Sequence, residues 1–172
     1  MKHILGKNTK TKISDIDESS IQPNAVDLRL DRIFVIQPNL FTLSENDKIH
    51  RETLEMYPQT EYNMTDGNSI ISGQWFWLPI GHYQILMKNK IIVGEKEAGW
   101  VVTRSTLIRN GIILSSGLYD SGYDGGMAAL LTVNIGAAHI QRNARIGQYL
   151  CYDAESLYKY KGSYGRNKDI EW

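Results

Sequence analysis

The chain has 172 residues, no net formal charge and a single cysteine. This length favours one domain, residues 1–172, with a substantial hydrophobic core. A neutral chain has no global field that would attract nucleic acid, and one cysteine excludes an intrachain disulfide and a cysteine-rich metal site. The first residues do not resemble a signal peptide, and no apolar run reaches the length of a membrane span. We therefore expect a cytoplasmic protein without nucleic-acid or membrane partners.

The first third of the chain is mostly polar. Residues 1–20 predict a flexible lead-in or a short helix. Residues 25–30 alternate apolar and charged side chains, which predicts a half-buried strand that continues through 33–36 and ends at Pro38. Residues 42–68 show no sustained period and predict a long excursion, with a short helix near 50–56. An excursion of this length in a compact domain suggests a function or an intersubunit contact.

From residue 69 onward the pattern is almost entirely that of short strands. Turn residues interrupt it at 88–90 and 142–145, and the final segment, 156–172, is basic and aromatic and suits a tail that closes over a site. Many short strands with little helix predict an all-β sandwich or barrel with one or two short helices. The predicted strands are 74–78, 83–87, 91–93, 100–102, 112–114, 127–133, 139–141 and 146–152.

The stretch from Trp100 to Gly126 places charged side chains between apolar strands, as a preorganised polyanion site requires. Thr103 or Ser105 is positioned to cap a short helical turn, and Gly111 to close it in the left-handed conformation. A glycine-rich turn, 117–126, then carries two carboxylates and two tyrosines.

Several kinds of chemistry lack their motifs. There is no H-x-E or C-x-x-C for a zinc deaminase, no P-loop, and no G-x-G-x-x-G or G-x-S-x-G. The four histidines (His3, His50, His82 and His139) are scattered and predict surface or core positions, and Cys151 predicts a core position. Asp120 has two interpretations. It is suited to orient a water molecule beside a phosphate held by Arg104, Ser105 and Arg109. Spacing alone favours the alternative, in which Asp120 stabilises its own turn as an Asx motif.

Two segments carry a resemblance to a known family. Residues 22–30 (QPNAVDLRL) and 104–111 (RSTLIRNG) resemble motifs of the dCTP deaminase and dUTPase superfamily, and the chain as a whole is nearest to the dCTP deaminases. Four further segments follow in the family's order: 77–81, the hairpin 117–125, Asn134 with 144–149, and the tail from Lys159 to Gly165. Each motif alone is weak, but six in the right order are specific.

The resemblance implies a distorted jelly-roll-like β-barrel of the dUTPase type, assembled as a homotrimer with active sites where subunits meet. It implies that Asp120 activates the attacking water, that Tyr123 packs on the deoxyribose, and that the tail closes on the phosphates. The positions that match the family's substrate-binding and catalytic residues are Arg104, Ser105, Thr106, Arg109, Asp120, Tyr123, Gln148, Lys159 and Tyr160.

The chain also departs from the family's pattern. In dCTP deaminases, a glutamate on the strand after the hairpin activates the water that attacks the base. The matching position in this chain is Leu130, Leu131 or Thr132, so the strand holds no carboxylate. Asp124 in the turn is the candidate to replace it. Gly125-Gly126 adds one residue, which predicts a β-bulge. Three further departures are Thr103 for glycine or proline, Tyr119 for isoleucine, and Ser163 for glutamine.

Three functions remain open on these observations. The first is a dUTPase-like hydrolase that converts dUTP to dUMP and pyrophosphate, with Mg²⁺ carried by the triphosphate, no direct protein ligand to the metal and no zinc. The second is a dCTP deaminase, alone or combined with dUTP hydrolysis, which needs a replacement general base. The third is an inactive nucleotide-binding or structural trimer.

Overall fold

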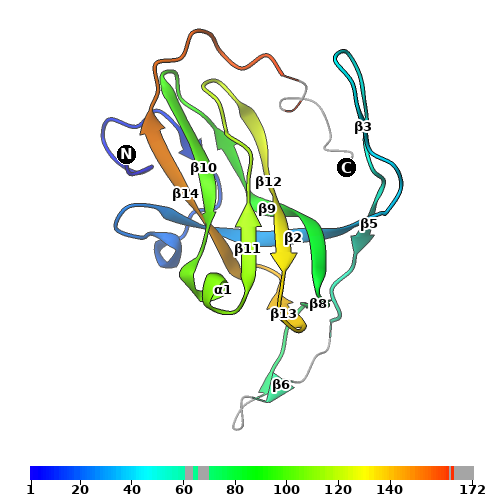
Figure 1. Ribbon diagram of the computed structural model, residues 1–172. Helices are drawn as coiled ribbons and strands as arrows, with labels where there is room; N and C mark the ends of the chain where they lie inside the picture. The colour runs from blue at the N-terminus through cyan, green and yellow to red at the C-terminus, as the bar shows by residue number, and fades with distance from the viewer. Residues whose placement is uncertain (61–63, 66–69, 163, 165–172) are drawn as a thin grey trace.

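The computed structural model describes residues 1–60, 64–65, 70–162 and 164. Six strands pair side by side, and the last pairs with the first, so that they close a barrel (Figure 1). This confirms the predicted all-β barrel. In order around the barrel, the strands are β9 (Gly81–Ile92), β12 (Asp124–Val133), β11 (Ile112–Ser115), β10 (Glu97–Thr103), β14 (Arg145–Asp153) and β2 (Val26–Ile36).

Shorter elements surround the barrel. β1 (Lys12–Ile13) pairs with β9, and β5 (Thr53–Met56) pairs with β2. β8 (Trp75–Leu78) and β13 (Ala138–Gln141) form a separate two-stranded sheet. The described helices are the 3-10 turn η1 (Glu18–Ser20) and the five-residue α1 (Ser105–Arg109).

Strand β9 runs unbroken through residues 88–90, where a turn was predicted. Its side chains alternate between the barrel interior and the surface, and Asn89 occupies an interior position at 1% exposure. The Asn89 amide accepts a hydrogen bond from the Arg29 backbone N–H (2.9 Å) and donates one to the Ser14 carbonyl (2.8 Å). Because both polar ends have partners, the buried amide does not interrupt the strand.

The predicted helix near 50–56 is wrong. Residues 53–56 form strand β5, whose pairing with β2 joins Ile33 to Met56. Arg32 and Glu55 add a bidentate ion pair across the two strands, with both hydrogen bonds at 2.6 Å. Strand pairing and this ion pair outweigh the weak helical propensity of the segment.

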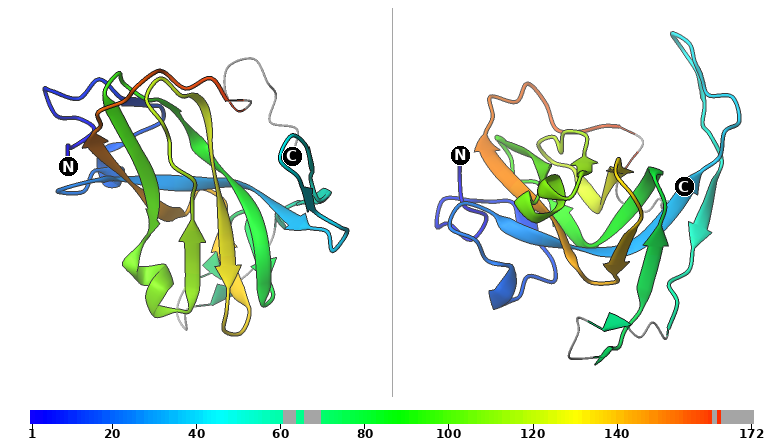
Figure 2. Two further views of the ribbon diagram at one scale, coloured as in Figure 1. Left: turned by 45° about the horizontal axis from the view of Figure 1, so that its top comes forward. Right: turned by 60° about the horizontal axis from the view of Figure 1, so that its bottom comes forward.

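Much of the predicted excursion 42–68 is an arm that stands out from the barrel (Figure 2). Its tip is the hairpin of β3 (Thr42–Leu43) and β4 (Lys48–Ile49), whose side chains are exposed. The backbones of β6 (Met64–Thr65) and β7 (Ile70–Ile71) form a second small hairpin, and the rest of 61–69 lies outside the described residues.

The N-terminal segment is tied to the barrel by a buried carboxylate. Glu97 accepts hydrogen bonds from the Thr11 hydroxyl (2.6 Å), the Thr11 and Lys10 backbone N–H groups and the Lys2 ammonium (3.0 Å). Burial raises the pKa of Glu97, but these donors outweigh it and hold the pKa at about 2. Residues 2–13 are therefore a fixed part of the fold rather than a flexible lead-in. Within residues 1–20, the one helical turn is η1.

Strand β10 sets the distance between helix α1 and the glycine-rich turn 117–122, the two segments that carry most of the predicted site residues. Helix α1 follows its C-terminal end, whereas the turn 117–122 lies beside its N-terminal part, where Tyr119 pairs with Gly99. Figure 1 accordingly shows α1 at the bottom of the barrel and the loop between β11 and β12 at the top. From Gly99, which pairs with Tyr119, to Arg104 the chain advances five extended residues, or roughly 17 Å, so the two segments are separated by more than the length of an arginine side chain.

Candidate functional site

At the α1 end, the candidate phosphate-binding residues gather around Asp27. This aspartate is fully buried, and its carboxylate lies 3.3 Å from Arg104 Nε and 3.4 Å from Arg145 Nη1. It also accepts hydrogen bonds from the side-chain amides of Gln22 (3.1 Å) and Gln148 (3.0 Å). One negative charge thus orients two guanidiniums and two amides.

Asp27 was not among the predicted site residues. In the sequence, Asp27 lies between Val26 and Leu28 in a stretch that alternates apolar and charged residues, a pattern that predicts an exposed side chain rather than a buried one. A buried carboxylate must find cationic or amide partners. Only the register of β14 against β2, which sets Gln148 opposite Asp27, shows which partners these are.

Arg104 itself occupies the N-cap position of α1, and no side chain caps the helix. The predicted capping by Thr103 or Ser105 is therefore wrong. The Thr103 hydroxyl instead bridges the backbone C=O and N–H of Leu114, both at 2.8 Å, because it lies at the end of β10 and faces β11. The Arg104 guanidinium donates to the Arg145 carbonyl at 3.1 Å, which fixes it from a second side.

Helix α1 exposes the other candidates of this group. Ser105, Thr106 and Arg109 all face solvent. Gly111 ends the helical turn with φ of +71°, as predicted. The Asn134 side chain donates to the Gly111 carbonyl (3.1 Å) and so anchors the turn to the end of β12.

At the other end of β10, the hairpin presents Asp120 to solvent. Its side chain makes no hydrogen bond to any described residue, so the Asx alternative is not realised within this part of the chain. The turn is held instead by a backbone bond from Tyr123 N–H to the Asp120 carbonyl (3.0 Å), with Gly122 at φ of +81°. The carboxylate is left available to solvent and ligands.

The start of the tail lies against this hairpin. The Tyr160 backbone N–H donates to the Ser121 carbonyl (2.8 Å), and the Tyr160 ring meets Tyr123 edge to face at 5.3 Å. Lys159 packs over Gly122 and forms an ion pair with Glu95, which lowers the pKa of that carboxyl group. The tail residues Lys159 and Tyr160 are therefore grouped with Asp120 and Tyr123, while Ser163 and residues 165–172 lie outside the described residues.

Between the hairpin and the tail is a pocket of about 190 Å³ with a mainly aromatic and glycine lining. Burial raises the pKa of Tyr123, whose hydroxyl donates to the Gly126 carbonyl at 2.8 Å. The residues that line the pocket are Gly117, Leu118, Tyr119, Tyr123, Gly126, Ala128, Tyr160 and Tyr164.

The strand that follows the hairpin confirms one prediction. The register of β12 against β9 shifts between Gly126 and Ala128, which is the predicted bulge. Leu131, one of the positions where the family's glutamate was expected, is fully buried in the core. The strand from Gly125 to Val133 therefore offers no carboxylate for general-base chemistry.

A single chain thus divides the predicted site residues into two groups. One group surrounds α1 and includes Arg104, Ser105, Thr106, Arg109 and Gln148. The other surrounds the hairpin and includes Asp120, Tyr123, Lys159 and Tyr160. The length of β10 keeps the two groups apart, so one chain does not bring Asp120 to the arginines.

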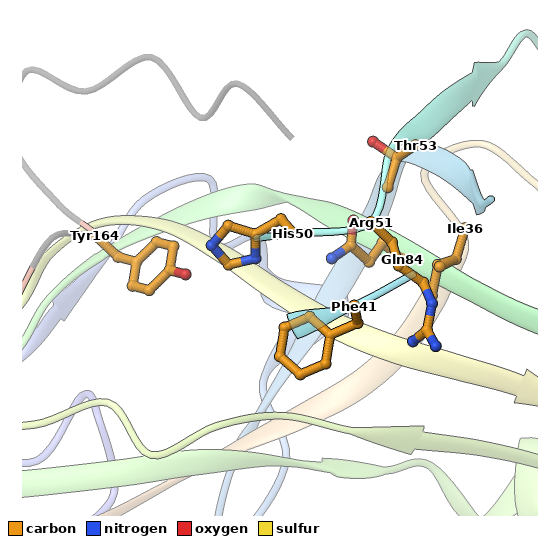
Figure 3. A pocket seen from close by; sticks show the side chains of 7 residues that line it. All are labelled: Ile36, Phe41, His50, Arg51, Thr53, Gln84 and Tyr164. Carbon is orange, nitrogen blue, oxygen red and sulfur yellow. The ribbon is translucent and has the colours of Figure 1, made fainter. Parts of the chain in front are cut away.

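A larger pocket, about 350 Å³, lies between the arm and the tail (Figure 3). Tyr164 faces His50 across it, and the Lys48 ammonium donates to the Tyr164 hydroxyl at 3.2 Å. The tail thus reaches the arm within one chain. The residues that line this pocket are Ile36, Phe41, His50, Arg51, Thr53, Gln84 and Tyr164.

The described residues contain no group of three or more histidine, cysteine or carboxylate side chains arranged to hold a metal ion. Within the same ranges, no helix is long and apolar enough to cross a membrane. Cys151 is a free, buried thiol, as predicted.

The chain is thus a closed six-stranded barrel with a buried polar cluster at one end and a glycine-rich hairpin at the other. The family model described as dCTP deaminase-like matches residues 2–153, and the chain belongs to this family.

Curated relatives are similar over most of their length. The chain is 32% identical over 154 residues to a probable deoxyuridine 5'-triphosphate nucleotidohydrolase from Methanopyrus kandleri, covering 88% of this chain and 92% of the relative. It is 30% identical over 165 residues to the deoxyuridine 5'-triphosphate nucleotidohydrolase from Methanocaldococcus jannaschii, covering 92% and 99%.

Solved structures share the fold at low identity. The dCTP deaminase from Agrobacterium tumefaciens aligns with a TM-score of 0.59 at 16% identity, covering 87% of this chain but only 45% of that one. A mutant dUTPase from phage phi11 of S. aureus aligns with a TM-score of 0.51 at 10% identity, covering 91% and 98%. Its description names a structural Mg(II) ion.

Proposed function

We propose that this protein hydrolyses dUTP to dUMP and pyrophosphate, with Asp120 activating the attacking water. The observation that carries the proposal is the contrast between two carboxylate positions. The hairpin retains an exposed aspartate without a hydrogen-bonding partner among the described residues, whereas the strand positions where the deaminase glutamate is expected hold Leu130, Leu131 and Thr132, none of which is a carboxylate. The archaeal relatives that carry the name of a dUTP nucleotidohydrolase support the same reaction.

The α1 group would bind the triphosphate. Arg104, oriented by Asp27, and the exposed Arg109 offer guanidiniums for charge-assisted hydrogen bonds to phosphate oxygens, and Ser105 and Thr106 add hydroxyl groups. Gln148, whose amide Asp27 holds, is a further phosphate donor. The hairpin group would hold the nucleoside, with Tyr123 against the sugar and Lys159 and Tyr160 closing over the ligand.

The separation of these two groups supports a site built from two copies of the chain. A homotrimer in which the α1 group of one subunit meets the hairpin group of the next would supply every predicted residue to each of three equivalent sites. In this arrangement the α1 group and the hairpin group, at opposite ends of β10, would act in the same active site.

Mg²⁺ would enter with the triphosphate, since magnesium commonly binds through substrate phosphates and few protein ligands, and it would neutralise part of their charge. The chemistry of the α1 group fits this role, because its guanidiniums and hydroxyl groups would bind phosphate oxygens and leave Mg²⁺ held by the triphosphate without a direct protein ligand. A cytoplasmic location accompanies the proposal.

A product assay tests the proposal. Purified protein is incubated with dUTP, dCTP or dTTP, with and without Mg²⁺, and nucleotides, pyrophosphate and ammonia are measured. We expect dUMP and pyrophosphate from dUTP. Ammonia and dUTP from dCTP would instead identify a deaminase that uses another base, such as Asp124, and the absence of every product would indicate a binding or structural protein.

A further inference from the structure

Tyr119 makes an unusual pair of hydrogen bonds across the hairpin. Its hydroxyl donates to the Ala128 carbonyl and accepts from the Ala128 N–H, both at 3.0 Å. The ring is 6% exposed and meets Tyr123 edge to face at 5.4 Å. One phenol therefore satisfies both backbone groups of one residue on the opposite strand.

The position of Ala128 explains why its backbone is open to a side chain. The ladder between β11 and β12 ends at the pair Ser115–Leu130, and the bulge lies between Gly126 and Ala128. Beyond Leu130 the two arms of the hairpin separate. The Ala128 N–H and C=O consequently face the pocket between them, where the Tyr119 hydroxyl stands in for a strand partner.

This donor–acceptor pair is the complement of a pyrimidine edge. Uracil and thymine present an N3–H donor beside a carbonyl oxygen, and cytosine presents an N3 acceptor beside an amino donor; either pairs with one peptide N–H and C=O. Ala128 and Tyr119 both line the pocket of about 190 Å³ between the hairpin and the tail, so a base that paired with the Ala128 peptide groups would compete with the Tyr119 hydroxyl for them.

We infer that Tyr119 is a built-in plug of the hairpin pocket: its phenol occupies the Ala128 peptide groups in the free protein, and a pyrimidine base must displace it to bind. The inference rests on the proposed function, because it assigns the nucleoside to this hairpin. The Tyr119 backbone is fixed to Gly99 by two hydrogen bonds, of 2.8 and 3.1 Å, so the displacement is a rotation of the side chain. Burial raises the pKa of Tyr119, which keeps the phenol neutral and able to donate.

The plug lowers affinity for the base because the competent conformation is only a fraction of the population. Tyr119→Phe removes both hydrogen bonds and keeps the ring, and Tyr119→Ile also removes the ring. The matched control is Tyr149→Phe. Tyr149 is a buried neighbour of Tyr119, at 6.1 Å between ring centroids, and its hydroxyl has no hydrogen-bond partner within the described residues.

Binding is measured by calorimetry with a non-hydrolysable imido analogue of dUTP and, separately, with inorganic tripolyphosphate, which has no base. We expect Tyr119→Phe to bind the analogue about ten-fold more tightly and Tyr119→Ile more tightly still. Tripolyphosphate affinity should be the same in all variants, and Tyr149→Phe should match the unmodified protein. In the unmodified protein, the ¹³Cζ resonance of Tyr119 should shift with the analogue but not with tripolyphosphate.

Equal or weaker binding of the analogue by both Tyr119 variants, with normal binding of tripolyphosphate, would overturn the plug and leave the proposed hydrolase intact. An unshifted Tyr119 resonance in the saturated complex would do the same. Failure of the unmodified protein to bind either probe would count against the proposed function itself, and against the plug with it.

Discussion

At the scale of single residues, the proposed role of Asp120 rests on its carboxylate chemistry and on its exposure to solvent. Its carboxylate is exposed and forms no hydrogen bond with any described residue. We predict that Asp120→Asn lowers kcat for dUTP hydrolysis by a factor of about 100 to 10,000, because the amide keeps the shape and loses the base. Binding of the imido analogue should change little. Near-normal turnover of this variant, measured by pyrophosphate release, would remove Asp120 from the mechanism.

Asp27 acts through the side chains it holds. Asp27→Asn removes the charge that orients Arg104 and Arg145, so we predict a KM for dUTP raised about ten-fold with a smaller change in kcat. Loss of one partner in a buried ion cluster should also lower the free energy of unfolding by roughly 3 kcal/mol.

The matched control for this prediction is Asp31→Asn on the same strand. Asp31 pairs with Arg142 at 2.6 Å in a partly exposed position, and such pairs contribute about 0 to 1 kcal/mol. Steady-state kinetics and urea unfolding of both variants separate the two cases. Equal KM values for the two variants would mean that Asp27 has only a structural role.

At the scale of elements, Glu97 joins the N-terminal segment to β10. Its pKa of about 2 lies below the ordinary value of 4.5, so the charged form stabilises the folded state. This stabilisation, roughly 3 kcal/mol, is fully present above about pH 5 and is lost as the pH falls towards 2. Glu97→Gln should lower stability at pH 7 and make the difference from the unmodified protein vanish near pH 2.

Urea unfolding between pH 2 and 7 measures this difference directly. Glu55→Gln is the comparison, because Glu55 also has a lowered pKa but its ion pair with Arg32 is partly exposed. We expect a much smaller pH dependence there. A constant gap between Glu97→Gln and the unmodified protein across this range would show that the carboxylate charge is not the source of the stability.

At the scale of the whole molecule, the separation of the two site groups predicts complementation between subunits. Asp120→Asn and Arg104→Ala are each expected to be nearly inactive alone. Trimers that contain both chains should recover about one third of the normal activity, because one of their three sites combines an intact hairpin from one subunit with an intact α1 group from the next.

Co-expression with two different affinity tags, followed by sequential purification, isolates the mixed trimers. Preparations of each variant alone, treated in the same way, should recover no activity. A mixture as inactive as its parents would indicate that both groups act from the same chain, contrary to the proposed intersubunit site.

The sequence by itself determined the class of fold, since β-type alternation and closely spaced turn residues are local signals. It also determined the Gly111 turn and the bulge after Gly125, because a glycine at a helix end and an extra residue in a strand can both be recognised in the local sequence. The tertiary structure decided the rest. Residues 88–90 and 53–56 are strands because they pair with distant strands, β9 with β12 and β2, and β5 with β2, and because the buried Asn89 amide finds its partners there. The partners of Asp27, the separation of Asp120 from Arg104 and the hydrogen bonds of Tyr119 depend on strand register, which joins residues far apart in the chain and has no local signature.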